Sequence, residues 1–290
     1  MSTVKENSMD KEWDLVIKPK SSLFDIDVKE VLKYKDLLMM FVKRDFISVY
    51  KQTILGPIWF FIQPIFTTIT FTIVFGTIAK ISTESIPAPL FYLAGITLWN
   101  YFSECLNKTS DVFTTNASIF GKVYFPRLVV PISIIVSNLL KLAVQFALFL
   151  GLWFYYLASD VYAIHPQYGY MILLPFLILI MALIGLGSGI ILSALTTKYR
   201  DLKFLISFGV QLLMYATPIV YPLSSATGKI KMILLLNPIT SVIELFKFMF
   251  LGVGSFNPMY LIYATVFSIL VFVLGVLIFN KVEKNFMDVV

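Results

Sequence analysis

Residues 170–196 read YMILLPFLILIMALIGLGSGIILSALT, a stretch in which none of the 27 side chains is charged. A helix rises about 1.5 Å per residue, so this stretch is about 40 Å long as a helix, which exceeds the roughly 30 Å of hydrocarbon in a bilayer. An ionised side chain at the centre of a bilayer costs a few kcal/mol or more. The stretch therefore predicts a transmembrane helix.

The charged residues of the whole chain are distributed in a way that agrees with this prediction. Of the 290 residues, 58% are hydrophobic and 14% are charged. Of the 40 charged residues, 19 lie in residues 1–54 and four in the last ten. The others are mostly clustered between apolar runs. A soluble core could not hide this much apolar surface, so we expect an integral membrane protein. The basic residues form no continuous stripe, so nucleic acid is not an expected partner.

Six apolar runs are each about 20 residues or longer, the length that a spanning helix needs. They lie at 57–79, 88–107, 129–157, 170–196, 203–222 and 258–280. Residues 223–257 differ, because a short apolar run there is interrupted by Asn237-Pro238, a dipeptide that favours a turn. The sequence thus predicts an all-α integral membrane fold with six transmembrane helices and a re-entrant helical hairpin before the last span.

The N-terminal part of the chain is polar and then amphipathic. We expect residues 1–30 to form a cytoplasmic arm, residues 31–54 an amphipathic helix in the membrane interface, and residues 55–290 the transmembrane domain. The first 30 residues contain no apolar core of a signal peptide. With both termini cytoplasmic, the inner segments hold 18 of the 23 Lys and Arg residues, as the positive-inside rule requires. The outer segments would hold Lys80, Lys229, Lys231 and Lys247.

Two spans carry ionisable residues that predict a contact between them. Glu104 lies near the end of the second span, and Lys141 lies within the third. Ionisable groups inside a membrane usually face the bundle interior and pair with each other, so we expect Glu104 to pair with Lys141. In the alternative, Lys141 extends to the interface. In the fourth span, Gly185 and Gly189 form a small-x-x-x-small pattern, which favours close helix packing.

Several kinds of site are missing from the sequence. It contains no P-loop motif for nucleotide phosphates, and no His, Cys and carboxylate cluster with the spacing of metal ligands. The only histidine, His165, is expected in a solvated turn next to a proline. Trp153 and the three aromatic residues after it are expected to form an interfacial belt at the end of the third span. We therefore expect no catalytic residues, metal or cofactor on this chain.

The polar loops and the remaining aromatic residues each allow two interpretations. Residues 112–128 and 197–203 mix basic with aromatic side chains. They act either as topology anchors, which need only Lys and Arg, or as a docking surface for a partner. Aromatic residues near the predicted spans either stack on the faces of sugars or simply face lipid. The sequence alone does not decide between these alternatives.

Several motifs together indicate a known family. They are YKQTILGP at residues 50–57, followed by Gln63-Pro64, KVYFPR at 122–127, Tyr199-Arg200-Asp201, and Leu236-Asn237-Pro238. Over about residues 35–285, the chain resembles the membrane subunit of type-2 ABC exporters of polysaccharides. These are the O-antigen, capsule and teichoic acid permeases. The resemblance implies a multi-pass protein of the bacterial inner membrane that moves a polyprenyl-diphosphate-linked glycan outward, with O-antigen favoured over capsule or teichoic acid.

The resemblance also implies partners and site residues. Two copies of the permease would pair as a homodimer and work with two copies of a separate ATPase, which binds ATP and Mg. The residues expected to couple to the ATPase are Lys43, Arg44, Lys51, Phe120, Lys122, Tyr124, Arg127, Tyr199, Arg200 and Asp201. Those expected at the glycan channel or gate are Trp59, Phe60, Tyr215, Tyr221, Asn237 and Phe246.

Two other classes of function compete with this one. A membrane enzyme acting on polyprenyl-linked glycans would need carboxylates or histidines gathered near one interface. Its candidates here, Glu104, Asp111 and Glu244, are scattered along the sequence. An ion-coupled transporter would be expected to show inverted repeats and charges near the midplane. Neither feature is evident in the sequence.

Overall fold

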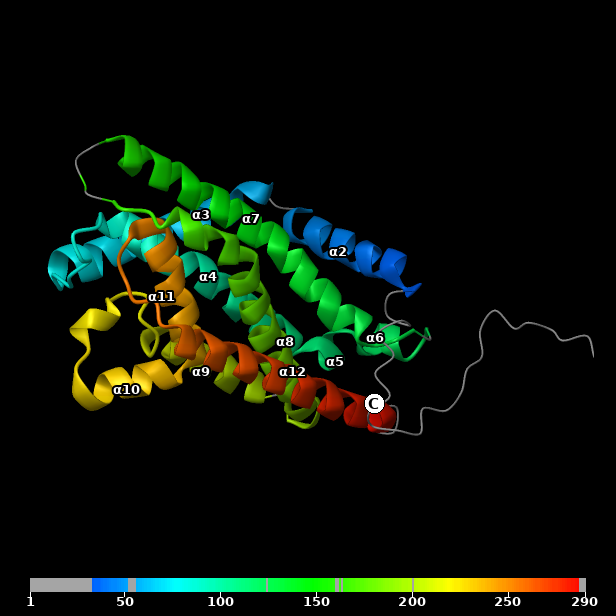
Figure 1. Cartoon of the computed structure of the whole chain (residues 1–290). Coiled ribbons are helices and arrows are strands. Elements are labelled where there is room, and N and C mark those ends of the chain that lie inside the picture. The colour runs from blue at the N-terminus through cyan, green and yellow to red at the C-terminus, as the bar shows by residue number, and fades with distance from the viewer. Residues whose placement is uncertain are drawn as a thin grey trace, which may run out of the picture.

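The fold is described from a computed structural model, which covers residues 33–51, 56–123, 125–159, 162, 164–199 and 201–286. These residues form helices and connecting loops, with no β-strand among them. The expected arm at residues 1–30 and the last four residues lie outside this range. The expected all-α fold is therefore confirmed (Figure 1).

The long helices follow the order of the predicted apolar segments. They are α2 (Lys35–Tyr50), α3 (Trp59–Phe71), α4 (Ala88–Thr109), α7 (Val129–Ala158), α8 (Leu174–Lys198), α9 (Leu202–Tyr215), α11 (Pro238–Leu251) and α12 (Pro258–Phe286). The shorter helices are α5 (Val112–Thr115), α6 (Ala117–Phe120) and α10 (Gly228–Leu236), with 3-10 turns η1 (Gly56–Ile58), η3 (Tyr168–Leu173) and η4 (Leu223–Ser225). The helix begun by α3 continues as a π-helical segment, η2 (Thr72–Ile78).

Glycines let α8 pack closely against two neighbours, α4 and α12. A Cβ on Gly185 would lie 2.9 Å from Cβ of Cys105, and one on Gly189 would lie 2.9 Å from the carbonyl oxygen of Leu106, both on α4. On the opposite side, a Cβ on Gly187 would lie 2.7 Å from the carbonyl group of Val271 on α12. Small residues allow backbones to approach this closely. The predicted small-residue packing is therefore confirmed on α8.

The count of six spanning helices is not confirmed. Among the described residues, four helical segments are long and apolar enough to cross a bilayer: Trp59–Ile78, Val129–Ala158, Tyr168–Lys198 and Pro258–Val282. Helix α4 is not one of them, because polar residues interrupt it, and most of its side chains are buried in the bundle. The run 203–222 does not form one continuous span, since α9 ends at Tyr215 after 14 residues, or about 21 Å.

The predicted hairpin before the last span is present, with its break at the predicted dipeptide. Helices α10 and α11 meet at an angle of 96° and could form one broken span or a re-entrant loop. The Oδ1 atom of Asn237 accepts a hydrogen bond from the backbone N–H of Ile239 at 3.1 Å and so caps α11. At its other end, α11 stops at Gly252, whose φ of +74° suits glycine. Most of α11 is buried, whereas most of α10 is exposed.

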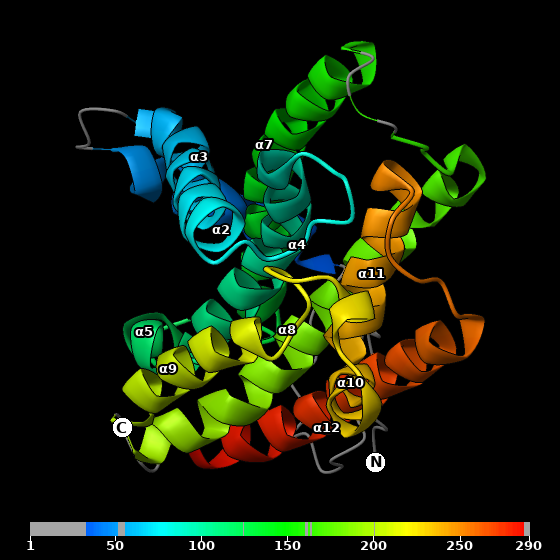
Figure 2. The same ribbon diagram turned by 90° about the vertical axis from the view of Figure 1, so that its left-hand side faces the viewer.

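The two ends of the bundle differ in structure. Helices α5 and α6 lie at one end with the C-terminal end of α12, and α10 lies at the opposite end (Figure 1). Figure 2 views the molecule from the α10 end, and α3 lies there beside α7 and α4. Helix α2 packs along α7, and the ring of Phe41 on α2 lies 5.9 Å from the ring of Phe125.

Trp153 corrects one sequence-based expectation. Its side chain is only 4% exposed, and its indole Nε1–H donates a 2.7 Å hydrogen bond to the carbonyl oxygen of Phe250 on α11. The neighbouring Phe154 and Tyr155 are exposed, as an interfacial belt requires. Trp153 therefore joins α7 to α11 instead of facing the membrane interface.

Candidate functional site

Three helices enclose a polar cavity inside the apolar part of the bundle. Its volume is about 220 Å³, and its walls come from α3, α4 and α7. The two ionisable residues paired by sequence analysis, Glu104 and Lys141, both line it. The Nζ atom of Lys141 donates a 2.9 Å hydrogen bond to Oε2 of Glu104. The structure thus brings together one carboxylate and one ammonium group from antiparallel helices.

Further polar groups extend this ion pair into a network. The Nζ atom of Lys108 lies 3.2 Å from the same Oε2 of Glu104 and 3.4 Å from Oδ1 of Asn138. Nearer the α10 end, the side-chain amide of Asn100 donates to Oε1 of Gln145 at 3.4 Å. Two ammonium groups therefore share one carboxylate, so this part of the bundle carries a net positive charge. Lys108 follows Glu104 by four residues on α4, a spacing at which side chains meet on one face of a helix.

Two of the expected channel residues border this cavity. Trp59 and Phe60 lie at the start of α3 and line its wall. The indole of Trp59 is half exposed, whereas Phe60 is buried, with its ring centroid 5.6 Å from Nζ of Lys141. An aromatic face close to an ammonium group attracts it electrostatically. Phe60 therefore helps to hold Lys141 in place.

The other expected gate residues fall into two groups. Asn237 joins α10 to the end of α9, because its Nδ2 atom donates to Oγ1 of Thr217 at 2.9 Å. Tyr221 lies nearby and donates from its hydroxyl to the carbonyl oxygen of Tyr215 at 3.0 Å, while the ring of Tyr215 is exposed. Phe246 differs from these residues in its exposure. It is fully buried among phenylalanine rings of α7 and α11, so it offers no surface to a glycan.

The segments expected to contact an ATPase meet at the α5–α6 end. The loop before α5 and the start of α9 are joined by an ion pair between Asp111 and Lys203. The hydroxyl of Thr196 donates a 2.6 Å hydrogen bond to the carbonyl oxygen of Ser110, which ties the end of α8 to the same loop. The ring of Phe125 lies 5.9 Å from the ring of Phe41 on α2 and 5.9 Å from the ring of Phe120 on α6. It therefore connects α2 to α6.

The expected coupling residues differ in exposure. The exposed residues among them are Lys43, Arg44, Lys51, Lys122, Tyr199 and Asp201. Phe120 is 4% exposed, so its ring packs inside the chain and offers no contact to a partner. Arg127 is half-buried, and its guanidinium lies 5.7 Å from the ring centroid of Phe120. Tyr124 and Arg200 lie outside the described residues.

Helix α11 contains two buried ionisable residues whose surroundings were not predicted. Lys247 was expected on an outer segment, but it is 0% exposed. Its Nζ atom donates to the carbonyl oxygen of Pro218 at 2.6 Å and lies 3.7 Å from the ring centroid of Phe91. Glu244 is 2% exposed, and its Oε2 atom accepts from the backbone N–H of Ser255 at 3.2 Å. A charge count along the sequence cannot reveal this, because tertiary packing decides which loops cover α11.

The polar cavity offers charged and amide side chains, but the described part of the chain has no metal-binding centre. Within the described ranges, no three His, Cys, Asp or Glu side chains lie close enough to hold a metal ion. His165 is exposed in the loop before η3, as expected for a solvated turn. The features that stand out are the polar cavity within apolar helices, the bent pair at one end, and the joined loops at the other.

The chain is similar to known proteins over most of its length. A family model described as ABC-2 type transporter matches residues 36–251. An O-antigen export system permease protein, RfbA, from Klebsiella pneumoniae is 26% identical over 255 residues, which cover 88% of this chain and 95% of that protein. A protein of the same name from Myxococcus xanthus is 28% identical over 226 residues, covering 77% of this chain and 83% of its own. The family match, together with the apolar helices and the bent pair at Asn237, identifies this chain as a member of the ABC-2 type transporter family.

Proposed function

We propose that this chain is the membrane-spanning permease subunit of an ATP-driven exporter of a lipid-linked polysaccharide, most closely of the O-antigen kind. The single observation that carries the proposal is the similarity to O-antigen export permeases, which extends over 88% of this chain. Membership of the ABC-2 family favours transport over an enzymatic activity on polyprenyl-linked glycans and over ion-coupled transport. Capsule and teichoic acid are the alternative glycans.

The proposal includes a partner that supplies the energy. Permeases of this family work with an ABC ATPase. We expect two ATPase subunits, which carry the ATP and Mg, to contact a homodimer of this chain. The α5–α6 end is suited to that contact, because Lys122 and Tyr199 are exposed there on loops held by the Asp111–Lys203 ion pair. This end would then face the cytoplasm of a bacterium, with both termini on that side of the inner membrane.

The mechanism that follows is mechanical. Closure of the ATPase dimer would push on the α5–α6 end, and the bundle would pass that displacement to the α10–α11 hairpin. A path for the glycan would open between the two permease copies, bordered by exposed rings such as Trp59 and Tyr215. Charged contacts at the ATPase surface would contribute about a kcal/mol or a few each, depending on burial.

Cells that lack this chain provide the decisive test. Surface polysaccharide and lipid-linked glycan on the cytoplasmic side are quantified together, with and without a plasmid that carries the wild-type chain. We expect loss at the cell surface with accumulation inside, and restoration by the plasmid. The composition of the accumulated glycan then separates O-antigen from capsule or teichoic acid. Loss of glycan in both places would point to synthesis and contradict the proposal.

Variants of the coupling end test the energy transfer. Tyr199→Ala removes an exposed ring without disturbing a buried contact, and Arg200→Ala removes the adjacent charge on sequence grounds. We expect both variants to reach the membrane at wild-type levels and to export several-fold less glycan, while the ATPase keeps its basal hydrolysis. Tyr162→Ala, which removes an exposed ring from the loop between α7 and α8, is the matched control. Normal export by the Tyr199 and Arg200 variants would place the coupling surface elsewhere.

A further inference from the structure

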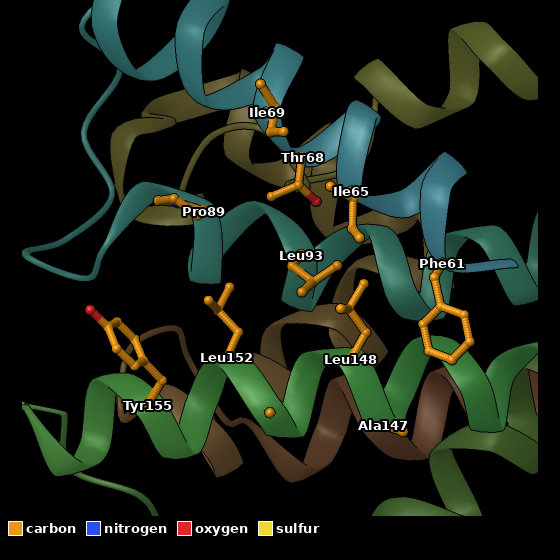
Figure 3. Close-up of a pocket in the computed structure, with 11 residues that line it drawn as sticks. Phe61, Ile65, Thr68, Ile69, Pro89, Leu93, Ala147, Leu148, Leu152 and Tyr155 are labelled. Carbon is orange, nitrogen blue, oxygen red and sulfur yellow. The ribbon is translucent and has the colours of Figure 1, made fainter. Parts of the chain in front are cut away.

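The cavities of the chain differ in what they can bind. One cavity between α3, α4 and α7 has a volume of about 530 Å³ and almost only apolar walls, formed by side chains such as Ile65, Leu93 and Leu148 (Figure 3). Apolar walls offer no hydrogen bonds to a polar molecule. A much smaller cavity, with a volume of about 10 Å³, lies where α10, α11 and the start of α12 meet. Its walls include buried polar side chains, so it suits a polar ligand.

Two side chains of α11 point to a ligand in this small cavity. Thr240 is 0% exposed and Glu244 is 2% exposed, and both line the cavity. They are four residues apart, a spacing that places both on one face of the helix. Among the described residues, neither Oγ1 of Thr240 nor Oε1 of Glu244 has a hydrogen-bond partner of normal geometry. Buried polar side-chain atoms nearly always have such a partner, so we looked for one that fits the cavity.

The bend between α10 and α11 explains why the hydroxyl of Thr240 is unpaired. A buried threonine hydroxyl on a helix commonly donates to the carbonyl oxygen four residues earlier, as that of Thr97 does at 2.7 Å. Four residues before Thr240 is Leu236, the last residue of α10. The carbonyl oxygen of Leu236 accepts a 2.9 Å hydrogen bond from the hydroxyl of Tyr263 instead. The bend therefore leaves the hydroxyl of Thr240 to the cavity.

The carboxylate of Glu244 also has unused capacity. Its Oε2 atom accepts from the backbone N–H of Ser255 at 3.2 Å, and the backbone N–H of Leu223 also donates toward this carboxylate. An ionised carboxylate has about four acceptor positions, so Oε1 can still accept a hydrogen bond. A buried water molecule typically makes about three hydrogen bonds. One water can therefore join Oε1 of Glu244 to the hydroxyl of Thr240.

The size and the charge of the cavity select water over other ligands. A single water needs about 10–15 Å³, and the cavity is at this limit, so it excludes anything larger. Lys247 lies within one turn of Glu244 on α11 and interacts with it electrostatically, so the carboxylate does not require a metal ion as its cation. In the part of the chain that the structure describes, no three His, Cys, Asp or Glu side chains are placed to hold a metal.

We propose that this cavity binds one ordered water molecule, which donates to Oε1 of Glu244 and shares a hydrogen bond with the hydroxyl of Thr240. The water completes the hydrogen bonding of the α11 face that closes against the loop before α12. The site follows from the packing of α11 and involves neither a glycan nor an ATPase. It therefore goes beyond the proposed function, and a negative result for either one leaves the other untouched.

A cryo-EM map of the intact exporter complex, sharp enough to show ordered water, tests the site. We expect a density peak about 2.5–3.0 Å from both Oγ1 of Thr240 and Oε1 of Glu244. Waters in the 220 Å³ cavity beside Lys141 serve as the internal reference. A map with those waters but no peak at Thr240, or with Oγ1 bonded directly to Oε1, would overturn the proposal. So would a peak with six or more oxygen ligands that is lost after treatment with EDTA, because it would be a metal ion.

Three variants test whether the hydroxyl of Thr240 holds the water. Thr240→Val replaces the hydroxyl by a methyl group, and we expect the density peak to disappear. Thr240→Ser keeps the hydroxyl and should keep the peak. Thr97→Val is the matched control, because Thr97 is also 0% exposed but its hydroxyl bonds within its own helix.

The same variants give a second measurement. The thermal midpoint of the complex, followed as the loss of its size-exclusion peak on heating, should fall by several degrees more in Thr240→Val than in Thr97→Val, because only the first leaves Oε1 of Glu244 without its partner. Equal midpoints for the two valine variants, or a density peak that persists in Thr240→Val, would show that this hydroxyl does not bind water and would overturn the proposal.

Discussion

The contact between α8 and α12 allows a stability effect to be estimated from geometry. A Cβ on Gly187 would lie 2.7 Å from both the carbonyl carbon and the carbonyl oxygen of Val271. Non-bonded heavy atoms prefer separations of about 3.5–4.0 Å, so α12 would have to retreat by about 1 Å. The obstructing atoms belong to the backbone and cannot rotate away as a side chain would. Overpacking of this kind costs about 1–3 kcal/mol, so we expect Gly187→Ala to destabilise the protein.

The measurement compares two identical substitutions on helices. Gly209→Ala on α9 is the control, because a Cβ there meets no atom within 4 Å. In a helix interior, replacing Gly by Ala without a clash should be neutral or should stabilise by up to about 1 kcal/mol. We expect the thermal midpoint of Gly187→Ala to fall by several degrees relative to Gly209→Ala. Both variants are heated in the same detergent, and the unfolding of each is followed as the loss of its monodisperse size-exclusion peak.

A second substitution sharpens this test. A Cβ on Gly275 of α12 would lie 2.7 Å from the carbonyl oxygen of Gly187, so both glycines relieve the same contact. Once α12 has moved away in Gly187→Ala, adding Gly275→Ala should cost less than it does alone, because neighbouring sites that share a backbone shift are not additive. Equal midpoints for Gly187→Ala and Gly209→Ala, or strictly additive losses in the double variant, would refute the reasoning.

Three further predictions concern polar contacts. Lys247→Met removes the buried ammonium group that donates to the carbonyl oxygen of Pro218, and it should cost about 1–3 kcal/mol, because that buried acceptor is left unpaired. The loss should be smaller in the double variant that adds Glu244→Gln, and folded yield in the membrane reports both. Trp153→Phe removes the indole hydrogen bond to α11 and should cost about 1–3 kcal/mol, measured as the thermal midpoint against the more conservative Phe154→Leu. Asp111→Asn breaks a partly exposed ion pair with Lys203 and should change the stability by at most about 1 kcal/mol, so a larger loss would mean that the pair holds the fold.

The chemistry of particular dipeptides and pairs was readable from the sequence. Asn237-Pro238 predicted a break because this dipeptide favours a turn, and the structure has a 96° bend there, where Asn237 caps α11. Glu104 and Lys141 were paired because uncompensated charges are costly inside a membrane, and their atoms lie 2.9 Å apart. These features depend on few residues and on strong local physics.

The features that the sequence did not reveal depend on which neighbour covers a helix face. Lys247 was counted with the outer segments, and that count did not show that α11 is enclosed or that this ammonium group binds a carbonyl group of the segment after α9. Trp153 and Phe246 have the composition of an interfacial belt and a gate, yet both are buried where α7 meets α11. Apolarity along residues 203–222 continues past Tyr215, where α9 ends. Hydropathy reports how apolar a segment is, and it does not report where backbone geometry interrupts the helix.

The glycine contacts of α8 also determine how a displacement could travel through the molecule. At Gly187 and Gly275 the backbones of α8 and α12 meet directly, so no side chain is left there to change rotamer and absorb movement, and α4 approaches α8 through the short side chains of Cys105 and Thr109. Helices α4, α8 and α12 should therefore respond to force as one stiff body, tied to the α5–α6 end through Thr196 and Ser110. Helix α3, which packs on the edge of this body through side chains and continues into the π-helical segment η2, is the part with room to yield. Any shape change during a transport cycle should then be concentrated at α3 and α10, with the interhelical distances around α8 preserved.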